Sequence, residues 1–121
     1  MSNTNPPNPR RGEVWDLNFD PTIGSEIQKI RPAVVINSDG VGHLPIKLVS
    51  PITGWQDRFL RNIWHVRIEP SGMNGLTKIS AVDTLQIRGV DVKRFISRRG
   101  RLSATLRQEI TAAIAAIIEH Q

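Results

Sequence analysis

Short stretches of alternating hydrophobic and polar residues run along the chain and predict a mainly β protein. In residues 15–19 the apolar side chains fall on one face and the polar ones on the other, which is the period of a half-buried strand. Residues 33–36 instead form a continuous apolar run after Pro32. Such a run suits a strand that is covered on both faces, and Pro32 marks its predicted start.

Three later stretches complete the predicted sheet. Residues 46–52 alternate and predict a third strand, which Pro51 should end or place at an edge. Residues 63–68 alternate again and put His65 on the polar face. Residues 81–90 follow a glycine-containing turn and are rich in β-branched side chains, which predicts one or two further short strands.

The C-terminal segment has a different period. Residues 103–120 carry apolar side chains at helical spacing behind an N-cap candidate, Ser103 or Thr105. The apolar stripe of this predicted helix must pack on another element, and a small curled sheet offers one open face. We therefore expect a mainly β fold, a small antiparallel β-barrel with a C-terminal α-helix.

Length and composition predict one domain. The chain has 121 residues and no cysteine, so neither a disulfide framework nor a thiolate metal site is available, and a reducing cytoplasm is the natural setting. Residues 1–10 are rich in proline and asparagine and are expected to be a disordered tail, with the domain spanning 11–121. No apolar run approaches the ~20 residues of a membrane span, so we expect no contact with membranes.

The charge balance favours an anionic partner. The chain has 16 Lys and Arg against 11 Asp and Glu, a formal net charge of +5. Most of the cations are arginines, which suit planar, bidentate contacts with phosphate. A basic run over 93–101 is consistent with an RNA track, but a solvated face has the same composition.

The loop between the first two predicted strands is the clearest candidate for chemistry. It holds turn residues and then a carboxylate, an amide and two cations within six positions. These are Glu26, Gln28, Lys29 and Arg31. Such a loop can hold a phosphate, and a solubilising loop can look the same, so composition alone leaves both possibilities open.

Six sequence blocks, in this order and spacing, resemble the MazF/PemK (Kid) family of toxin endoribonucleases of type II toxin–antitoxin systems. The blocks are RGEVW at 11–15, DPTIGSE at 20–26, KIRPAVVIN at 29–37, VSPITG at 49–54, GLTKIS at 75–80 and LQIRGVDVKRF at 85–95. The resemblance extends from Arg11 to the C-terminus. It implies a Src-homology-3-like barrel of the CcdB/MazF type, a homodimer, and neutralisation by a cognate antitoxin.

The resemblance also implies an activity, the metal-independent and cofactor-independent cleavage of single-stranded RNA, including mRNA, which inhibits translation and growth. In such a reaction the 2′-hydroxyl attacks the adjacent phosphorus and leaves a 2′,3′-cyclic phosphate and a 5′-hydroxyl. By resemblance Arg31 and Thr53 carry the reaction. An arginine stays protonated, so Arg31 suits a clamp for the growing phosphorane charge better than a proton acceptor.

The remaining roles are less constrained. Thr53 can donate its hydroxyl to a phosphate oxygen or orient the 2′-hydroxyl. Glu26 is the best carboxylate to accept the proton, although a loop carboxylate paired with Lys29 or Arg31 is the alternative. RNA bases are expected to contact polar groups of the loop, residues of the later strands and one exposed aromatic ring. The predicted RNA-binding residues are Gln28, Lys29, Trp55, Ser80 and Gln86.

One position departs from the family pattern. Leu85 stands where relatives often carry an acidic residue, just before Gln86. A carboxylate at this position therefore cannot act here, although Asp83 would lie on the same strand face and could take its place.

The histidines do not predict a catalytic pair or a metal site. His43 lies in a glycine-rich loop, His65 on a polar strand face and His120 at the C-terminus, with no shared motif or metal-ligand spacing.

Two other functions fit a barrel of this type. One is a non-catalytic, CcdB-like toxin that binds DNA gyrase, but such proteins use an aromatic residue in a C-terminal tripeptide, whereas this chain ends in Glu119, His120 and Gln121. The other is a degenerate RNA-binding barrel that has lost catalysis. The RNA cut motif and the identity of the antitoxin cannot be read from the sequence.

Overall fold

The computed structural model of the chain describes residues 7–21, 23–26 and 29–120. Its strands are β1 (Glu13–Asn18), β2 (Ile30–Val35), β3 (Ile46–Gly54), β4 (His65–Ile68), β5 (Ser80–Asp83), β6 (Arg88–Asp91) and β7 (Phe95–Arg101). Four short 3-10 helices, η1 (Asp39–Val41), η2 (Asp57–Arg61), η3 (Thr84–Gln86) and η4 (Val92–Arg94), lie in the connections, and α1 (Ala104–Ile117) follows the last strand.

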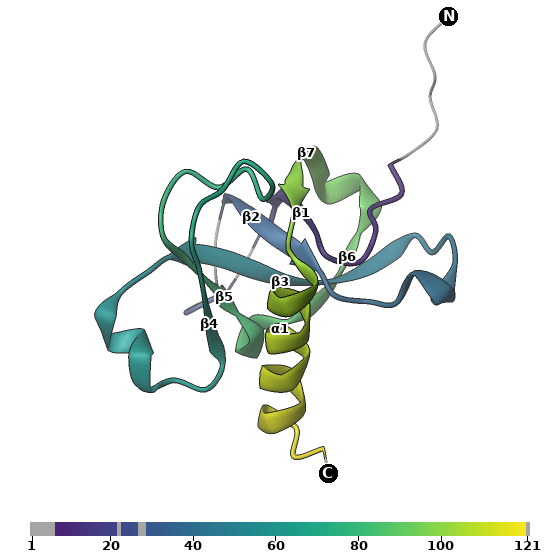
Figure 1. The fold of residues 1–121 in the computed structure, drawn as a ribbon. Coiled ribbons are helices and arrows are strands. Elements are labelled where there is room, and N and C mark those ends of the chain that lie inside the picture. Colours follow the sequence, from purple (N-terminus) through teal and green to yellow (C-terminus); the bar gives the residue numbers. More distant parts are fainter. Residues whose placement is uncertain (1–6, 22, 27–28, 121) are drawn as a thin grey trace, which may run out of the picture.

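The strands form one antiparallel sheet in the order β4-β5-β3-β2-β1-β7, and β6 pairs with the first half of β3 (Figure 1). This confirms the predicted mainly β fold with a C-terminal helix. Within the part of the chain that the structure describes, no pairing joins the edge strands β4 and β7. The sheet is therefore curled but not closed, and the word barrel describes it only loosely.

The sheet has a hydrophobic cluster on each face. On one face, side chains of β1 to β5 pack against Ile110 and Ala113 of α1. On the other face, a second cluster joins β1, β2 and β3 to β6, η4 and β7, where the sheet curls over itself. Strand β2 contributes Val34 to the first cluster and Ala33 and Val35 to the second, which confirms that both of its faces are covered.

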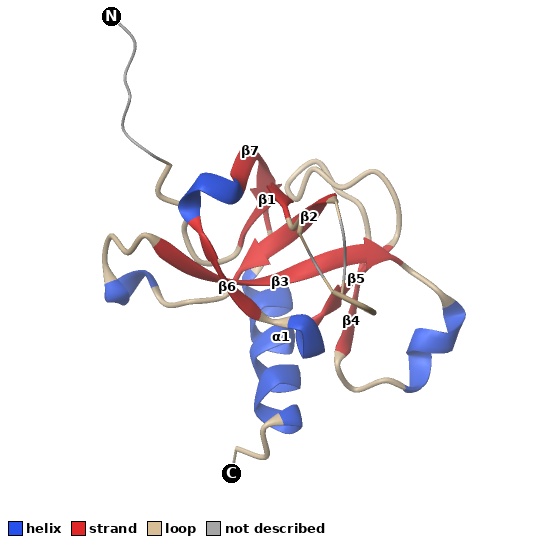
Figure 2. Cartoon of the chain, turned by 180° about the vertical axis from the view of Figure 1, so that it is seen from behind, coloured by secondary structure: helices blue, strands red, loops and turns tan. Residues whose placement is uncertain are grey.

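The C-terminal helix is as predicted. Ser103 is its N-cap, and its side chain accepts a hydrogen bond from the backbone N–H of Leu106 at 3.2 Å. Figure 1 shows α1 in front of the sheet and Figure 2, from behind, shows the strands between the viewer and the helix. The face of the sheet that turns away from α1 is not covered by the helix and carries the second hydrophobic cluster.

Two predictions about prolines are wrong. Strand β2 begins at Ile30, before Pro32, and Pro51 lies inside β3, paired with Ala33 of β2, rather than at an end or edge. The other edge of β3 explains this. It pairs with β6 up to Val49 and with β5 from Ile52 onward. Pro51 lies in the gap between these two partners, where a missing N–H costs no hydrogen bond of the ladder.

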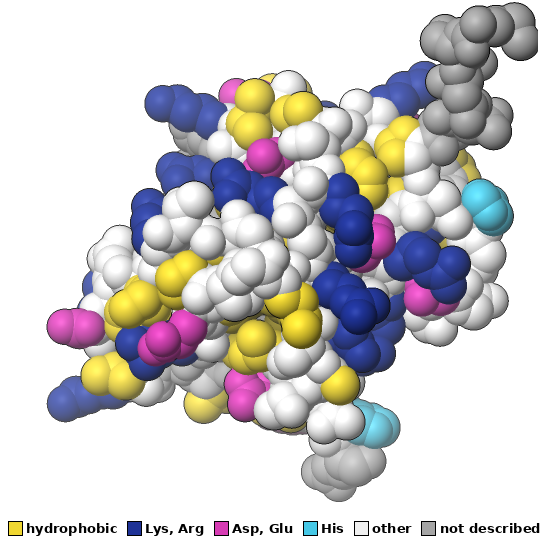
Figure 3. Space-filling model, turned by 45° about the horizontal axis from the view of Figure 1, so that its top comes forward, with side chains coloured by type: hydrophobic (Ala, Val, Ile, Leu, Met, Phe, Trp, Pro, Cys, Tyr) yellow, Lys and Arg dark blue, Asp and Glu magenta, His cyan; other side chains and the backbone are white. Residues whose placement is uncertain are grey.

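Strand β7 was not among the predicted elements, because its basic residues mask the strand pattern. It pairs antiparallel with β1, and two of its arginines form ion pairs there, Arg98 with Glu13 at 2.9 Å and Arg99 with Asp16 at 2.7 Å. On the face that Figure 3 shows, Lys and Arg side chains form several separate groups, with carboxylates against some of them.

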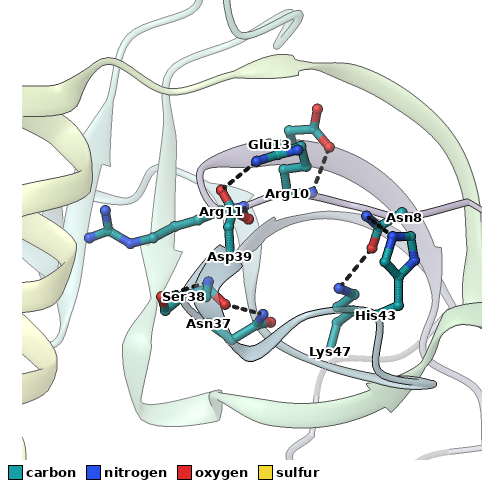
Figure 4. A network of polar contacts seen from close by, with 10 residues as sticks. Asn8, Arg10, Arg11, Glu13, Asn37, Ser38, Asp39, His43 and Lys47 are labelled. Atoms are coloured by element: carbon teal, nitrogen blue, oxygen red, sulfur yellow. Dashed lines mark hydrogen bonds and ion pairs between the residues drawn. The ribbon is translucent and has the colours of Figure 1, made fainter.

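Residues 7–10 contact the domain, whereas residues 1–6 of the predicted tail lie outside the described residues. Lys47 donates to the side-chain oxygen of Asn8 at 3.1 Å, and Arg10 pairs with Asp39 at 3.5 Å (Figure 4). The backbone N–H of Arg11 donates to the same carboxylate at 2.8 Å. The contacts of the domain thus begin ahead of Arg11. None of the described helices is long and apolar enough to cross a membrane.

Candidate functional site

The register of β2 against β3 brings Arg31 and Thr53 together. Ala33 is paired with Pro51, and Arg31 and Thr53 each lie two residues beyond this pair along their strands. Because side chains alternate along a strand, both residues lie on the face that turns away from α1. They line one hollow of about 160 Å³.

Strand β5 adds Ser80 to this hollow. Thr53 is paired with Ala81, and Gly54 with Ser80. The hydroxyl of Ser80 is buried and donates to the backbone carbonyl of Lys78 at 2.9 Å. The structure thus brings together three of the residues predicted for the site.

Two cations that are not among the predicted site residues also line this hollow, Lys78 and Arg99. A Cβ atom at Gly54 would lie only 3.2 Å from the amine of Lys78, so the glycine leaves room for the lysine side chain. The Nε of Arg99 donates to Asp16 at 2.7 Å and its guanidinium also donates to the carbonyl of Gly75 at 3.0 Å. Lys78 belongs to the GLTKIS block and Arg99 to the basic run, which are the signals that could have found them.

A second hollow of about 500 Å³ adjoins the first and shares Thr53 with it. Gln86, Asp83 and His65 line it, and η2 supplies Phe59 and Arg58. The carboxylate of Asp83 accepts from the side-chain amide of Gln86 at 2.9 Å and from the backbone N–H of Leu85 at 3.1 Å.

The environment of His65 is both aromatic and polar. Its ring stacks on Phe59 with centroids 3.8 Å apart, its Nδ1 lies 3.1 Å from the amide nitrogen of Asn62, and its Nε2 lies 3.8 Å from Asp83. Burial lowers the pKa of His65 below its usual 6.5; the charge of Asp83 opposes this shift and the charge of Arg58 adds to it. The ring is therefore predominantly neutral at pH 7.

Glu26 lies apart from Arg31 and Thr53. It lines a third hollow of about 360 Å³ with Arg88 and with Gln86, which this hollow shares with the second. Its carboxylate accepts from the backbone N–H of Ile23 at 2.6 Å. Among the described residues, Glu26 thus lines a different hollow from Arg31 and Thr53, and Gln86 links that hollow to the second one.

The other predicted RNA-binding residues lie at the margin. Lys29 is exposed, with its backbone N–H bonded to Asp20 at 2.8 Å, and it lines none of the three hollows. Trp55 also lines none of the three hollows and is half-buried. Its indole N–H donates to Asp57 at 3.3 Å, and the guanidinium of Arg67 lies 5.6 Å from its ring centre. Gln28 lies outside the described residues.

The expectation that Asp83 and Leu85 share a strand face is wrong, because β5 ends at Asp83 and Leu85 belongs to η3, 60% exposed. Asp83 nevertheless lies beside Gln86 in the second hollow. The three histidines belong to three different parts of the chain. His43 lies near Asn8 at 3.4 Å and His120 follows the helix, far from His65 in sequence and element.

Comparison with known proteins identifies relatives over nearly the whole chain. The sequence model of a protein family, described as PemK-like, MazF-like toxin of type II toxin–antitoxin system, matches residues 10–118. The Endoribonuclease MazF of Staphylococcus saprophyticus is 36% identical over 106 residues, which are 87% of this chain and 87% of that protein. Endoribonuclease MazF9 of Mycobacterium tuberculosis is 29% identical over 87% of this chain and 92% of its own.

Solved structures share the fold. The Mycobacterium tuberculosis toxin MazF-mt6 superposes with a TM-score of 0.73 at 21% identity, covering 90% of this chain and 98% of its own. An endoribonuclease in complex with its cognate antitoxin from a mycobacterial species superposes with a TM-score of 0.74 at 16% identity, covering 94% and 98%.

Proposed function

The chain belongs to the PemK-like, MazF-like toxin family of type II toxin–antitoxin systems, and we propose that it is an endoribonuclease that cuts single-stranded RNA by attack of the 2′-hydroxyl. One observation carries this proposal, namely that Arg31 and Thr53, which are far apart in sequence, line one hollow with two further cations. Cations around a hydroxyl, Arg31 and Lys78 together with Arg99, whose charge is shared with Asp16, suit a phosphodiester whose charge increases during the reaction.

The roles follow from the chemistry of each group. The 2′-oxygen bonds to phosphorus, the bond from phosphorus to the 5′-oxygen breaks, and the products are a 2′,3′-cyclic phosphate and a 5′-hydroxyl. Arg31 stabilises the phosphorane charge as a fixed cation. Thr53 donates to a phosphate oxygen or orients the 2′-hydroxyl. Lys78 and Arg99 hold the phosphate from the other side of the hollow. No step requires a metal or another cofactor.

The RNA strand runs along the linked hollows. The shared residues Thr53 and Gln86 join the three hollows into one path. Ser80 and Gln86 contact bases along this path, while Gln28, Lys29 and Trp55 contact the strand at its margins. Glu26 is the carboxylate at the far end of the path, next to Gln86.

The partners extend the same proposal. We expect the active form to be a cytoplasmic homodimer that a cognate antitoxin neutralises, and we expect the free toxin to cleave mRNA and so to inhibit translation and growth. The support is family membership together with the mycobacterial relative of the same fold, which was solved with its cognate antitoxin.

Cleavage of a single-stranded RNA by the purified protein in excess EDTA tests the proposal. The expected products end in a cyclic phosphate and a 5′-hydroxyl, and 2′-deoxy substitution at each cut position should abolish the cut there. Cleavage that survives the substitution excludes 2′-hydroxyl attack. Binding of RNA without any cleavage would indicate a degenerate RNA-binding protein, and binding to DNA gyrase instead would indicate a CcdB-like toxin.

Arg31→Ala tests the assigned site. Loss of the cation that stabilises the phosphorane should reduce cleavage by about 100-fold or more, while the circular dichroism spectrum stays unchanged because Arg31 is exposed. Arg101→Ala is the matched control, since Arg101 is an exposed arginine outside the three hollows. Equal activity of the two variants would mean that the site lies elsewhere.

A further inference from the structure

His65 and Asp83 lie on the same face of the sheet as Thr53. In the pairing of β3 with β5, Thr53 is opposite Ala81, and in the pairing of β5 with β4, Asp83 is opposite His65. Ala81 and Asp83 are two positions apart on β5, so their side chains point to one side. All three polar residues, Thr53, His65 and Asp83, line the hollow of about 500 Å³.

The imidazole ring is held in one orientation. Phe59 stacks on it at an interplanar angle of 11°, and the amide nitrogen of Asn62 lies 3.1 Å from Nδ1. An amide nitrogen can only donate, so we assign Nδ1 as the acceptor in this contact, which places the proton of the neutral ring on Nε2. The basic nitrogen of His65 is therefore Nδ1, on the side where Asn62 borders the hollow.

The carboxylate of Asp83 lies on the opposite side of the ring. Its Oδ2 is 3.8 Å from Nε2, a separation that closes to a hydrogen bond with a small movement when substrate binds. Asp83 is itself held by Leu85 and Gln86. The side chains of His65 and Asp83 are only 8% and 11% exposed, so the charge of the carboxylate acts on the ring with little screening by water.

The proposed reaction needs a proton acceptor that its other residues do not provide. Arg31 is permanently protonated and Thr53 is not basic. Glu26 lines a different hollow and its carboxylate is bonded to the N–H of Ile23, while position 85 holds a leucine.

We propose that His65 is the general base that takes the proton of the attacking 2′-hydroxyl, and that Asp83 is the positioning residue that orients its ring; the inference rests on the proposed ribonuclease function. The 2′-hydroxyl replaces the amide of Asn62 at Nδ1. As the 2′-oxygen bonds to phosphorus, its proton passes to Nδ1 and the resulting imidazolium is stabilised by Asp83. The 5′-oxygen departs and takes a proton from water, and His65 returns its proton to solvent after the product leaves.

The charged groups that face the ring set the pH range of this role. They are Asp83 from β5 and Arg58 from η2. Because burial outweighs the carboxylate and lowers the pKa of His65 below 6.5, the base is unprotonated at neutral pH. The value of kcat/KM should therefore rise with pH along an acidic limb whose midpoint lies below 6.5.

His65→Gln is the decisive variant. Its amide can still donate toward Asp83, but it has no basic nitrogen. We expect kcat to fall by about 100-fold or more, with KM within about threefold of the wild-type value and with the acidic limb abolished.

Asp83→Asn should shift the acidic limb and lower kcat less than His65→Gln does. His43→Gln, an exposed histidine outside the hollows, should leave both rate and pH profile unchanged, and Glu26→Gln should lower the rate less than about tenfold.

A second variant guards against a purely structural effect. His65→Ala opens a space beside Phe59, and added imidazole should restore cleavage in a concentration-dependent way, with the acidic limb set by the free imidazole. In a substrate with sulfur in place of the scissile 5′-oxygen, the leaving group departs more readily. Such a substrate should not rescue His65→Gln, because the step that this variant lacks is removal of the 2′-proton. Full rescue by that substrate would assign His65 to leaving-group protonation and overturn the base role.

The outcomes separate this inference from the proposed function. Suppose that the wild type cleaves RNA, that Arg31→Ala does not, and that His65→Gln keeps the rate within threefold with an unaltered acidic limb. The roles proposed for His65 and Asp83 are then wrong, while the proposed ribonuclease function stands. If the wild type does not cleave RNA, the proposed function fails, and the roles of His65 and Asp83 fail with it.

Discussion

Arg31 and Thr53 show how much depends on where single side chains point. Both are polar, Arg31 precedes and Thr53 follows the buried stretch of its strand, and both lie on the face that the helix leaves uncovered. Lys78 and Arg99 reach the same hollow from a loop and from the edge strand β7. The site is thus built from side chains of four separate segments, and each can be changed without altering the hydrophobic clusters.

Thr53→Val tests the hydroxyl separately from the shape of the side chain. Valine keeps the volume and suits a strand, so the fold should be retained. Loss of a hydrogen bond to a charged phosphate should lower kcat/KM by about 10- to 100-fold. Steady-state cleavage of a labelled oligonucleotide measures this. A change of less than about twofold would show that the hydroxyl does not act on the phosphate or the nucleophile.

Stability should depend on pH through His65. Its pKa in the folded protein is below the unfolded value of 6.5, so the folded state binds fewer protons between these two values. The contribution of the neutral ring is present above pH 6.5 and is lost as the pH falls through the lowered pKa. Urea unfolding at pH 7.5 and pH 5 should show a larger loss for the wild type than for His65→Gln. Equal losses would contradict a lowered pKa.

The helices and strands differ in how clearly they can be predicted from their own sequences. The helix, strand β1 and the doubly covered strand β2 follow from local periodicity, because each buries a regular set of side chains. Strand β3 alternates too, yet its period does not say which face is inside, and the structure buries Lys47 and Val49 while Ile46 and Leu48 remain exposed. Strand β7 is set by its pairing with β1, which local composition does not reveal.

Helix α1 stabilises the fold by covering one face of the sheet, and Ile110 is its most buried isoleucine. Ile110→Ala should lower the free energy of unfolding by about 2–5 kcal/mol, since it leaves a cavity against β-strand side chains. Ile118→Ala is the control, because Ile118 is 68% exposed, and it should change stability by less than about 0.5 kcal/mol. Denaturant titrations measure both, and equal effects would mean that the helix does not dock as described.

In the whole molecule, the hydrophobic clusters that stabilise the fold are separate from the hollows proposed to bind RNA. One face of the sheet is closed by the helix, and the other curls over a second hydrophobic cluster and leaves three adjoining hollows at its rim. The hollows lie where β2, β3 and β5 meet the long connections. A strand of RNA can therefore cross the molecule without disturbing either cluster.

Binding of RNA should weaken steeply with salt. For a single strand, each phosphate that a cation of the protein neutralises should add about −0.7 to the slope of log K against log salt, and the hollow lined by Arg31 and Lys78 should supply such contacts. A 2′-deoxy oligonucleotide, which cannot be cut, allows the measurement with the wild-type protein. Lys78→Gln should reduce the slope by about 0.7, and Lys93→Gln, an exposed lysine outside the hollows, should not. The same slope for both variants would place the bound phosphate elsewhere.

The sequence by itself determined the elements whose signal is local, and the motifs that name the family. A strand period, an apolar run and a capped helix each depend on residues close in sequence, so they can be read before folding. The pairings of β3 with β2 and β5 depend on contacts between distant residues, and only the tertiary structure decided them. Together with the pairing of β5 with β4, that register brings Arg31 and Thr53 to one hollow and Thr53 and His65 to a second, while Glu26 lines a third.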